Sequence, residues 1–279
     1  MATLHHAGAS LHYQDAGEGA PVVALHGSAS TGAQWRSLVG YIAGRFRVLT
    51  PDLPGYGRSE PVLGANGLID DSRAIAALIE SVGQPVHLVG ASYGAAVALR
   101  LASLRPEALR SLTLIEPVSF YLLRRSVRAD QELYNDVAGL AARIFSRSIG
   151  GDRAEAMRIF IDYWNGEGAW GRTSARLREE LVGHLGRVCA DLRAVMFEHQ
   201  TLEDLAELDC PTLAILGDDS PFVSHRLAEL VTGAIPRATL RRVAGAGHLV
   251  ALTDPHVVDP MVAEHLLAVD RARARAAAA

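Results

Sequence analysis

Short runs of apolar residues alternate with longer segments of helical period over most of the chain. Six such runs are short enough to be strands: Pro21–Leu25, Phe46–Thr50, Val86–Val89, Leu112–Ile115, Thr212–Leu216 and Thr239–Val243. Two more stretches, Thr3–His6 and Ser10–Gln14, flank Ala7-Gly8-Ala9 and predict an antiparallel hairpin. Strands that alternate with helices are typical of α/β proteins with a mostly parallel sheet. The pattern therefore predicts eight strands, with the hairpin at the edge of the sheet.

The segments between the strands have the features of helices packed on a sheet. Asp71–Val82 has an apolar stripe on one face, and Gly83 is placed to end it. Ala95–Leu104 and Pro255–Val269 are the other two clear examples. Residues 271–279 alternate arginine with alanine and have no apolar stripe, so we expect a frayed tail there.

The alternation stops between Ser119 and Leu205, where four helical stretches follow one another without a strand. Their apolar positions centre on Leu140, Phe160, Leu181 and Leu192. An all-helical insert of this length is expected to lie over the edge of the sheet as a cap. The predicted organisation is a core of residues 1–118 and 205–279, with a cap of residues 119–204.

The charged residues exclude several kinds of enzyme. All 27 basic residues of the 279 are arginine, and the chain has no lysine. A P-loop lysine, a Schiff-base aldolase and a pyridoxal-phosphate enzyme each require an ε-amine, so these classes are excluded. The net charge is −4 and no basic run lies among aromatic residues, which argues against nucleic acid as a partner.

The remaining composition points to a cytoplasmic protein without cofactors. The N-terminus lacks the charged and apolar regions of a signal peptide, and no apolar run approaches 18 residues, so we expect no membrane span. Cys189 and Cys210 have neither disulfide-framework nor metal-ligand spacing and are interpreted as small core residues. No metal site or organic cofactor is implied.

One motif carries nucleophile chemistry. Gly90-Ala91-Ser92-Tyr93-Gly94 matches the pattern Gly-x-Ser-x-Gly, which is weak evidence by itself. Here it follows the apolar run Val86–Val89 and precedes a helical segment. That strand–turn–helix setting is what a nucleophile elbow requires, since the flanking glycines permit a strained turn that exposes the serine hydroxyl. We therefore predict Ser92 as a nucleophile.

A serine nucleophile needs a base, and one of the 11 histidines is placed for that role. His248 ends Gly245-Ala246-Gly247-His248, directly after the last predicted strand. Ligands of open parallel sheets bind at the carboxyl ends of the strands. A histidine in such a glycine-rich loop has no evident packing role, so we predict His248 as the base.

With these motifs in place, the chain resembles the α/β-hydrolase superfamily over nearly its whole length. His26-Gly27 after the strand Pro21–Leu25 is similar to that family's oxyanion-loop motif. The segment Asp52–Ser59, DLPGYGRS, is similar to its D-x-P-G-x-G-x-S loop. The resemblance implies a serine hydrolase in which the backbone amides of Ser28 and Tyr93 form the oxyanion hole, where two such donors stabilise the transition state by several kcal/mol.

The acid of the triad departs from the common family pattern. Family members usually have Gly-x-x-Asp after the strand that is here Thr212–Leu216, but this chain has serine, Ser220, at the acid position. Glu116, directly after Leu112–Ile115, can also reach the histidine and is our preferred acid. Asp219, with a shift of one residue in its loop, is the alternative, and Asp218 a third candidate.

The predicted function is hydrolysis of a small or medium carboxylic ester through an acyl-enzyme. Trp164 and Trp170 of the cap, together with His26, are candidates for the substrate pocket. The alternatives are C–C bond hydrolysis of a vinylogous diketo acid, a non-catalytic ligand-binding role on the same fold, and acyl transfer to an alcohol other than water. Neither the natural substrate nor the oligomeric state follows from the sequence.

Overall fold

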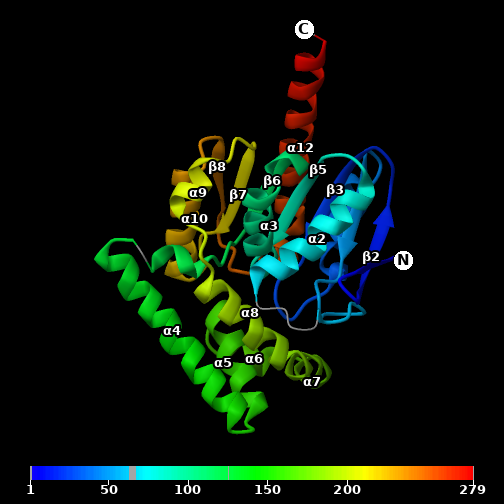
Figure 1. The fold of residues 1–279 in the computed structure, drawn as a ribbon. Helices are drawn as coiled ribbons and strands as arrows, with labels where there is room; N and C mark the ends of the chain where they lie inside the picture. Colours follow the sequence, from blue (N-terminus) through cyan, green and yellow to red (C-terminus); the bar gives the residue numbers. More distant parts are fainter. Residues whose placement is uncertain (1, 63–66, 125, 279) are drawn as a thin grey trace.

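The computed structural model describes residues 2–62, 67–124 and 126–278, shown in Figure 1. It contains one sheet of eight strands in the order β1-β2-β4-β3-β5-β6-β7-β8. The pairs β1·β2 and β2·β4 are antiparallel, and all other pairs are parallel. The strands are β1 Ala2–His6, β2 Ala9–Ala16, β3 Ala20–Leu25, β4 Phe46–Pro51, β5 Val86–Ala91, β6 Leu109–Ile115, β7 Thr212–Gly217 and β8 Ala238–Val243. The predicted eight-stranded, mostly parallel sheet is confirmed.

The helices fall into those that cover the sheet and those inserted between β6 and β7. The covering helices are α1 Arg36–Ile42, α2 Leu68–Val82, α3 Tyr93–Leu104, α10 Phe222–Ala234, α11 Val250–Thr253 and α12 Pro255–Ala277. The inserted helices are α4 Arg128–Ile149, α5 Arg153–Asn165, α6 Ala169–Arg172, α7 Ala175–Gly183, α8 Leu185–Phe197 and α9 Leu202–Ala206. All four helical stretches expected in the cap are present, with α6 and α9 as short additions.

Local chemistry explains where several elements begin and end. Ala7 and Gly8 have φ of 48° and 78°, which is the left-handed backbone of the tight turn that favours hairpins. Gly83 ends α2 with φ of 75°, as the sequence predicts. The helix itself begins at Leu68, three residues earlier than expected.

One expectation about the C-terminus is wrong. Residues from Arg271 were expected to fray, but α12 continues to Ala277 and projects beyond the sheet in Figure 1. Arginine and alanine both have high intrinsic helix propensity, so the segment extends the helix without an apolar stripe. Its side chains are exposed.

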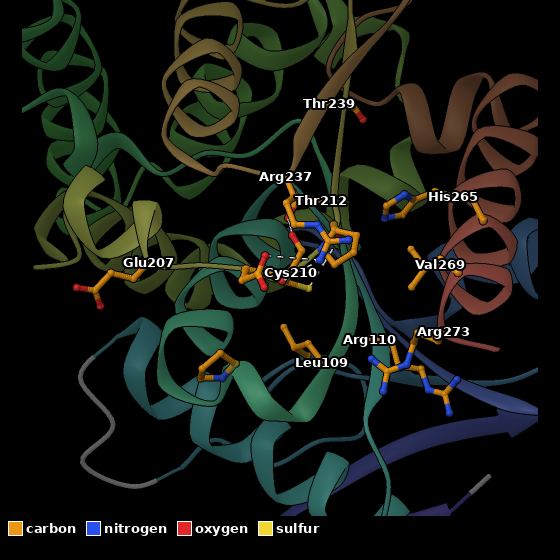
Figure 2. Close-up of a pocket in the computed structure, with 15 residues that line it drawn as sticks. Leu109, Arg110, Glu207, Cys210, Thr212, Arg237, Thr239, His265, Val269 and Arg273 are labelled. Atoms are coloured by element: carbon orange, nitrogen blue, oxygen red, sulfur yellow. Dashed lines mark hydrogen bonds and ion pairs between the residues drawn. The ribbon is translucent and has the colours of Figure 1, made fainter. Parts of the chain in front are cut away.

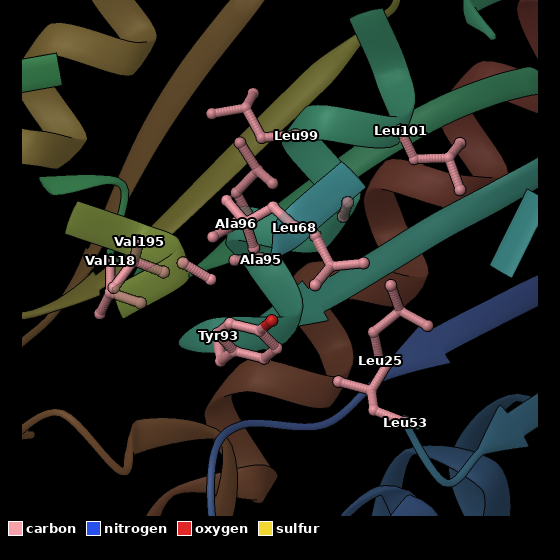
Figure 3. Close-up of a cluster of buried hydrophobic side chains, with 14 of the residues drawn as sticks. Leu25, Leu53, Leu68, Tyr93, Ala95, Ala96, Leu99, Leu101, Val118 and Val195 are labelled. Carbon is pink, nitrogen blue, oxygen red and sulfur yellow. The ribbon is translucent and has the colours of Figure 1, made fainter. Parts of the chain in front are cut away.

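Two layers of helix enclose the sheet, each with its own apolar core. One core contains α2, α3 and α10, with Leu78, Leu99 and Leu227 fully buried. Figure 3 shows part of this core around α3, with Ala96 beside Ala95 and Leu25 beside Leu53. The other core contains α1 and α12, with Leu38 and Leu266 buried against the opposite face. Within the described residues, no helix is both long and apolar enough to cross a membrane.

Candidate active site

The turn between β5 and α3 presents Ser92 in a strained conformation. Ser92 has φ of 51° and ψ of −117°, in a region that costs a non-glycine residue of order 1–3 kcal/mol. Its amide donates to the carbonyl of Ile115 at the end of β6, at 2.8 Å. Its carbonyl accepts from the amides of Ala95 and Ala96 in the first turn of α3. The turn is therefore held at both ends by backbone hydrogen bonds.

The glycines of the motif are required by close backbone approach. A Cβ at Gly90 would lie 2.4 Å from the carbonyl oxygen of Gly94. A Cβ at Gly94 would lie 2.3 Å from the carbonyl oxygen of Leu25 in β3. No side chain can be accommodated at these distances, so the elbow packs tightly against β3 only with glycine at both positions.

The loops after β5, β6 and β8 bring three side chains into one hydrogen-bonded chain. His248 Nε2 lies 3.0 Å from Ser92 Oγ, and His248 Nδ1 lies 3.0 Å from Glu116 Oε2. Glu116 is fully buried and His248 almost so. Because a carboxylate only accepts, Nδ1 carries the proton and leaves Nε2 free to accept the serine hydroxyl.

The second oxygen of Glu116 is held by the loop where the family acid was expected. Oε1 accepts from the amide of Gly217 and from the hydroxyl of Ser220, each at 2.7 Å. Asp218 and Asp219 are exposed, and Asp218 lies 3.6 Å from Arg242. The structure thus brings Glu116, and neither aspartate, to His248. The serine at the acid position becomes a donor to the glutamate.

Both expected oxyanion-hole residues lie beside the serine. Tyr93 begins α3, so its amide belongs to the helix N-terminus, where amides have no acceptor within the helix and the dipole favours negative charge. Ser28 follows Gly27, whose backbone packs so closely that a Cβ there would lie 3.2 Å from Ser92 Cβ. The next residue, Ala29, has φ of 57°.

The three pocket candidates have different surroundings. His26 is fully buried, its Nδ1 bonding the carbonyl of Gly27 at 2.8 Å and its Nε2 accepting from the amide of Leu53 at 2.9 Å. Burial lowers the pKa of His26 to about 4, so the ring is neutral and holds two loops together. Its ring has no exposed surface.

The tryptophans of the cap are also unequal. The Trp164 ring stacks on His248, with ring centroids 4.0 Å apart and planes at 26°, and it stacks on Phe120 on another side. Trp170 lies instead against Arg178 of α7, whose guanidinium carbon is 5.9 Å from the ring centroid. Trp164 is therefore the tryptophan that α5 brings to the triad.

A model described as the alpha/beta hydrolase family matches residues 22–260 of the chain. The chain belongs to the alpha/beta hydrolase family. The hydrolase is similar to a pimeloyl-acyl-carrier-protein methyl ester esterase of Methylococcus capsulatus, with 30% identity over 87% of this chain and 93% of the esterase. RutD of Azorhizobium caulinodans, provisionally named a carbamate hydrolase, is 25% identical over 94% of this chain and 97% of RutD.

Solved structures show the same fold. A thermophilic esterase from Thermogutta terrifontis, solved with malate bound, superposes on the hydrolase with a TM-score of 0.71 and 25% identity. The match covers 94% of both chains, inserted helices included. The eight-stranded sheet with a helical insert is thus shared with an esterase over nearly its whole length.

The hydrolase also contains a buried polar cluster that the sequence did not reveal. Arg187 and Asp191 of α8 meet Asp71 of α2, together with the hydroxyls of Tyr56 and Tyr93. Both aspartate side chains are 2% exposed. A signal was present, because Asp71 and Asp191 lie on the apolar faces of their helices. A charge on a buried face requires a partner elsewhere in the fold.

The cluster predicts a pH dependence of stability. Burial raises the pKa of Asp191 to about 7, so between about pH 4 and 7 the folded state holds a proton that the unfolded state releases. This contribution to stability is complete below the unfolded pKa and is lost as the pH rises to about 7. Relative to Asp191→Asn, the wild type should therefore lose free energy of unfolding between pH 5 and pH 7.5.

Urea unfolding of both proteins at the two pH values measures this difference. Asp209→Asn, a change at an exposed aspartate, is the matched control and should follow the wild type. Parallel pH dependence of the wild type and Asp191→Asn would contradict the assignment.

A separate hollow of about 690 Å³ lies at the opposite edge of the sheet, where β6, β7 and β8 begin (Figure 2). Leu109, Thr212 and Thr239 mark these strand starts on its wall. Its thiol, Cys210, has its pKa raised to about 12 by burial, so it is not a nucleophile near neutral pH. Among the described residues, no group of three or more His, Cys, Asp or Glu side chains is arranged to hold a metal ion. Ser92, Glu116 and His248 lie at the other end of the strands, after the carboxyl ends of β5, β6 and β8.

Proposed function

We propose that the protein is a serine hydrolase that cleaves a small or medium carboxylic ester. The observation that supports this most strongly is the chain of hydrogen bonds from Ser92 through His248 to Glu116, with 3.0 Å at each step. Nucleophile, base and orienting acid are the groups that acyl transfer requires, and the backbone amides of Ser28 and Tyr93 are the proposed donors to the oxyanion.

The proposed reaction has two halves. Ser92 Oγ attacks the ester carbonyl while His248 Nε2 takes the hydroxyl proton, and the amides of Ser28 and Tyr93 stabilise the negative oxygen. His248 then protonates the leaving alcohol. In the second half the same nitrogen activates water, which attacks the acyl-enzyme and releases the acid. Glu116 keeps the proton on Nδ1 throughout and stabilises the imidazolium.

Labelling by a fluorophosphonate probe tests the proposal directly. We expect stoichiometric modification of native protein, with the adduct on the peptide that contains Ser92, and no labelling after heat denaturation. Hydrolysis of p-nitrophenyl acetate, butyrate and octanoate then ranks acyl length. A native protein that neither labels nor hydrolyses these esters would contradict the ester reaction and favour a ligand-binding role.

C–C bond hydrolysis of a vinylogous diketo acid is the second candidate, since it would use the same serine, histidine and oxyanion site. The aspartate usual at the acid position in that branch is replaced by Ser220, which counts against it. Loss of the visible absorbance of an aromatic ring-cleavage product, measured beside the ester assay, distinguishes the two reactions.

The stack of Trp164 on His248 predicts a moderate effect on rate. When His248 takes the proton it becomes a cation against the indole face, an arrangement that stabilises by about 0.5–2 kcal/mol. Trp164→Leu should therefore lower kcat/KM for p-nitrophenyl butyrate roughly 2- to 30-fold. Trp164→Phe keeps an aromatic face and should retain most activity. Equal losses in both variants would show that packing volume, and not the ring, matters.

A further inference from the structure

Both residues proposed for the oxyanion hole are anchored through their side chains, each on a different aspartate. Ser28 Oγ donates to Asp191 Oδ2 at 2.6 Å. The Tyr93 hydroxyl donates to Asp71 Oδ2 at 2.5 Å. The proposed reaction uses only the backbone amides of Ser28 and Tyr93, so it does not explain the hydrogen bonds that their side chains form.

One guanidinium joins the two aspartates. Arg187 forms an ion pair with Asp71 through an Nη atom, and its Nε lies 2.8 Å from Asp191 Oδ1. The same Nη lies 3.3 Å from the Tyr93 hydroxyl, and the guanidinium carbon lies 5.6 Å from the centroid of the Tyr93 ring. Arg187 is thus a cation that the anchors of both residues share.

We infer that Arg187 is a positioning residue of the oxyanion hole, which holds Ser28 through Asp191 and Tyr93 through Asp71. This inference rests on the proposed function. Arg187 contacts Asp71 and Asp191, so it acts on the oxyanion hole through these two aspartates.

The oxyanion loop depends on such anchors because its backbone is irregular. Ser28 follows the end of β3 and precedes Ala29, whose φ is 57°. Tyr56 also links the loop to Asp191. Its hydroxyl accepts a hydrogen bond from the amide of Ala29 and donates one to Asp191 at 2.5 Å. Asp191 therefore restrains two successive residues of the loop.

At a pH above about 7, where Asp191 is ionised, removal of Arg187 would leave two buried carboxylates without a counter-ion. Such a pair takes up protons or moves apart, and in either case it becomes a poorer acceptor for the hydroxyls of Ser28 and Tyr93. A displacement of about 1 Å at a site of transition-state contact lowers a rate about 100-fold. Because Arg187 and Asp191 belong to α8, the hole is complete only when the inserted helices are seated on the core.

The test compares Arg187→Met with Arg193→Met, an exposed arginine on the same helix. We expect Arg187→Met to lower kcat for p-nitrophenyl butyrate about 10- to 100-fold, with KM changed less than about threefold. The Ki of a trifluoromethyl ketone, which forms a tetrahedral oxyanion on the serine, should rise by the same factor. Partial unfolding would reduce the number of active sites but leave Ki unchanged.

A second variant removes the hydrogen bonds to the two aspartates and leaves Arg187, Asp71 and Asp191 unchanged. Ser28→Ala/Tyr93→Phe removes both hydroxyls and keeps both amides, so it should reproduce the loss in kcat and the rise in Ki. Adding Arg187→Met to it should then have little further effect, because the anchors act as one unit. If Arg187→Met does not fold, the double variant alone decides the matter.

The outcomes separate this inference from the function on which it rests. An active wild type with an unchanged Ki in Arg187→Met or in the double variant would overturn the role of Arg187 and leave the hydrolase proposal intact. A wild type that is inactive toward esters and not inhibited by the ketone would overturn both.

Discussion

Replacement of Ser92 by alanine is expected to lower kcat/KM for p-nitrophenyl butyrate by about a million-fold, the scale on which serine hydrolases lose activity with their nucleophile. The remaining donors can still polarise the carbonyl, but no covalent intermediate can form. Alanine is no worse than serine in the left-handed conformation at this position, so the elbow should keep its shape.

The measurement is a steady-state rate with fluorophosphonate labelling in parallel. Ser146→Ala, at an exposed serine of α4, is the matched control and should keep wild-type activity and labelling. Thermal melting of both variants verifies folding. If the kcat/KM of Ser92→Ala for the ester stayed within tenfold of the wild-type value, the proposed mechanism would be wrong.

Replacement of Glu116 by glutamine is expected to lower kcat/KM about 10,000-fold, the scale on which a serine hydrolase loses activity with its orienting acid. The expected loss of activity follows from the hydrogen-bond donors around the Glu116 carboxylate. Oε1 accepts from the Gly217 amide and the Ser220 hydroxyl, so the single oxygen of glutamine takes that place. Its NH₂ group then faces His248 Nδ1 and stabilises the tautomer that cannot accept a proton from Ser92.

The control for this variant is Asp219→Asn, which changes the alternative acid in the same isosteric way. Asp219 is exposed, so its variant should stay within about threefold of the wild type, the small effect expected of a surface change. If Asp219→Asn lost activity and Glu116→Gln kept it, the acid would be Asp219 and the loop after β7 would rearrange in the working enzyme. The class of enzyme would be unaffected.

Much of the fold follows from local patterns in the chain. The strands are short apolar runs and the helices have apolar stripes, and these periodicities do not depend on the rest of the molecule. The eight strands and their edge hairpin were predictable for this reason. The elbow at Ser92 was predictable too, since its motif lies within five residues between an apolar strand and a helix, although the need for glycine at Gly94 comes from the close approach of Leu25 in β3.

The choice among acids depended on distance across the sheet. Glu116 lies 132 residues from His248 along the chain, and three candidate carboxylates follow two neighbouring strands. The backbone conformation after each strand decides whether a carboxylate is directed toward His248 or toward solvent. Glu116 has φ of 52°, and Gly217 and Ser220 turn toward it as donors. None of this leaves a periodic signal in the sequence.

The sequence by itself determined the sheet, the inserted helices, the elbow serine and the loop histidine, because each depends on residues close together in the chain. Tertiary structure decided which carboxylate meets His248, that Trp164 and not Trp170 stacks on it, and that Arg187 joins Asp71 to Asp191. These contacts join segments up to 132 residues apart. Which residues meet in these contacts depends on how the helices and loops pack in space. The sequence pattern shows only that a buried charged residue needs a partner, and not which residue that partner is.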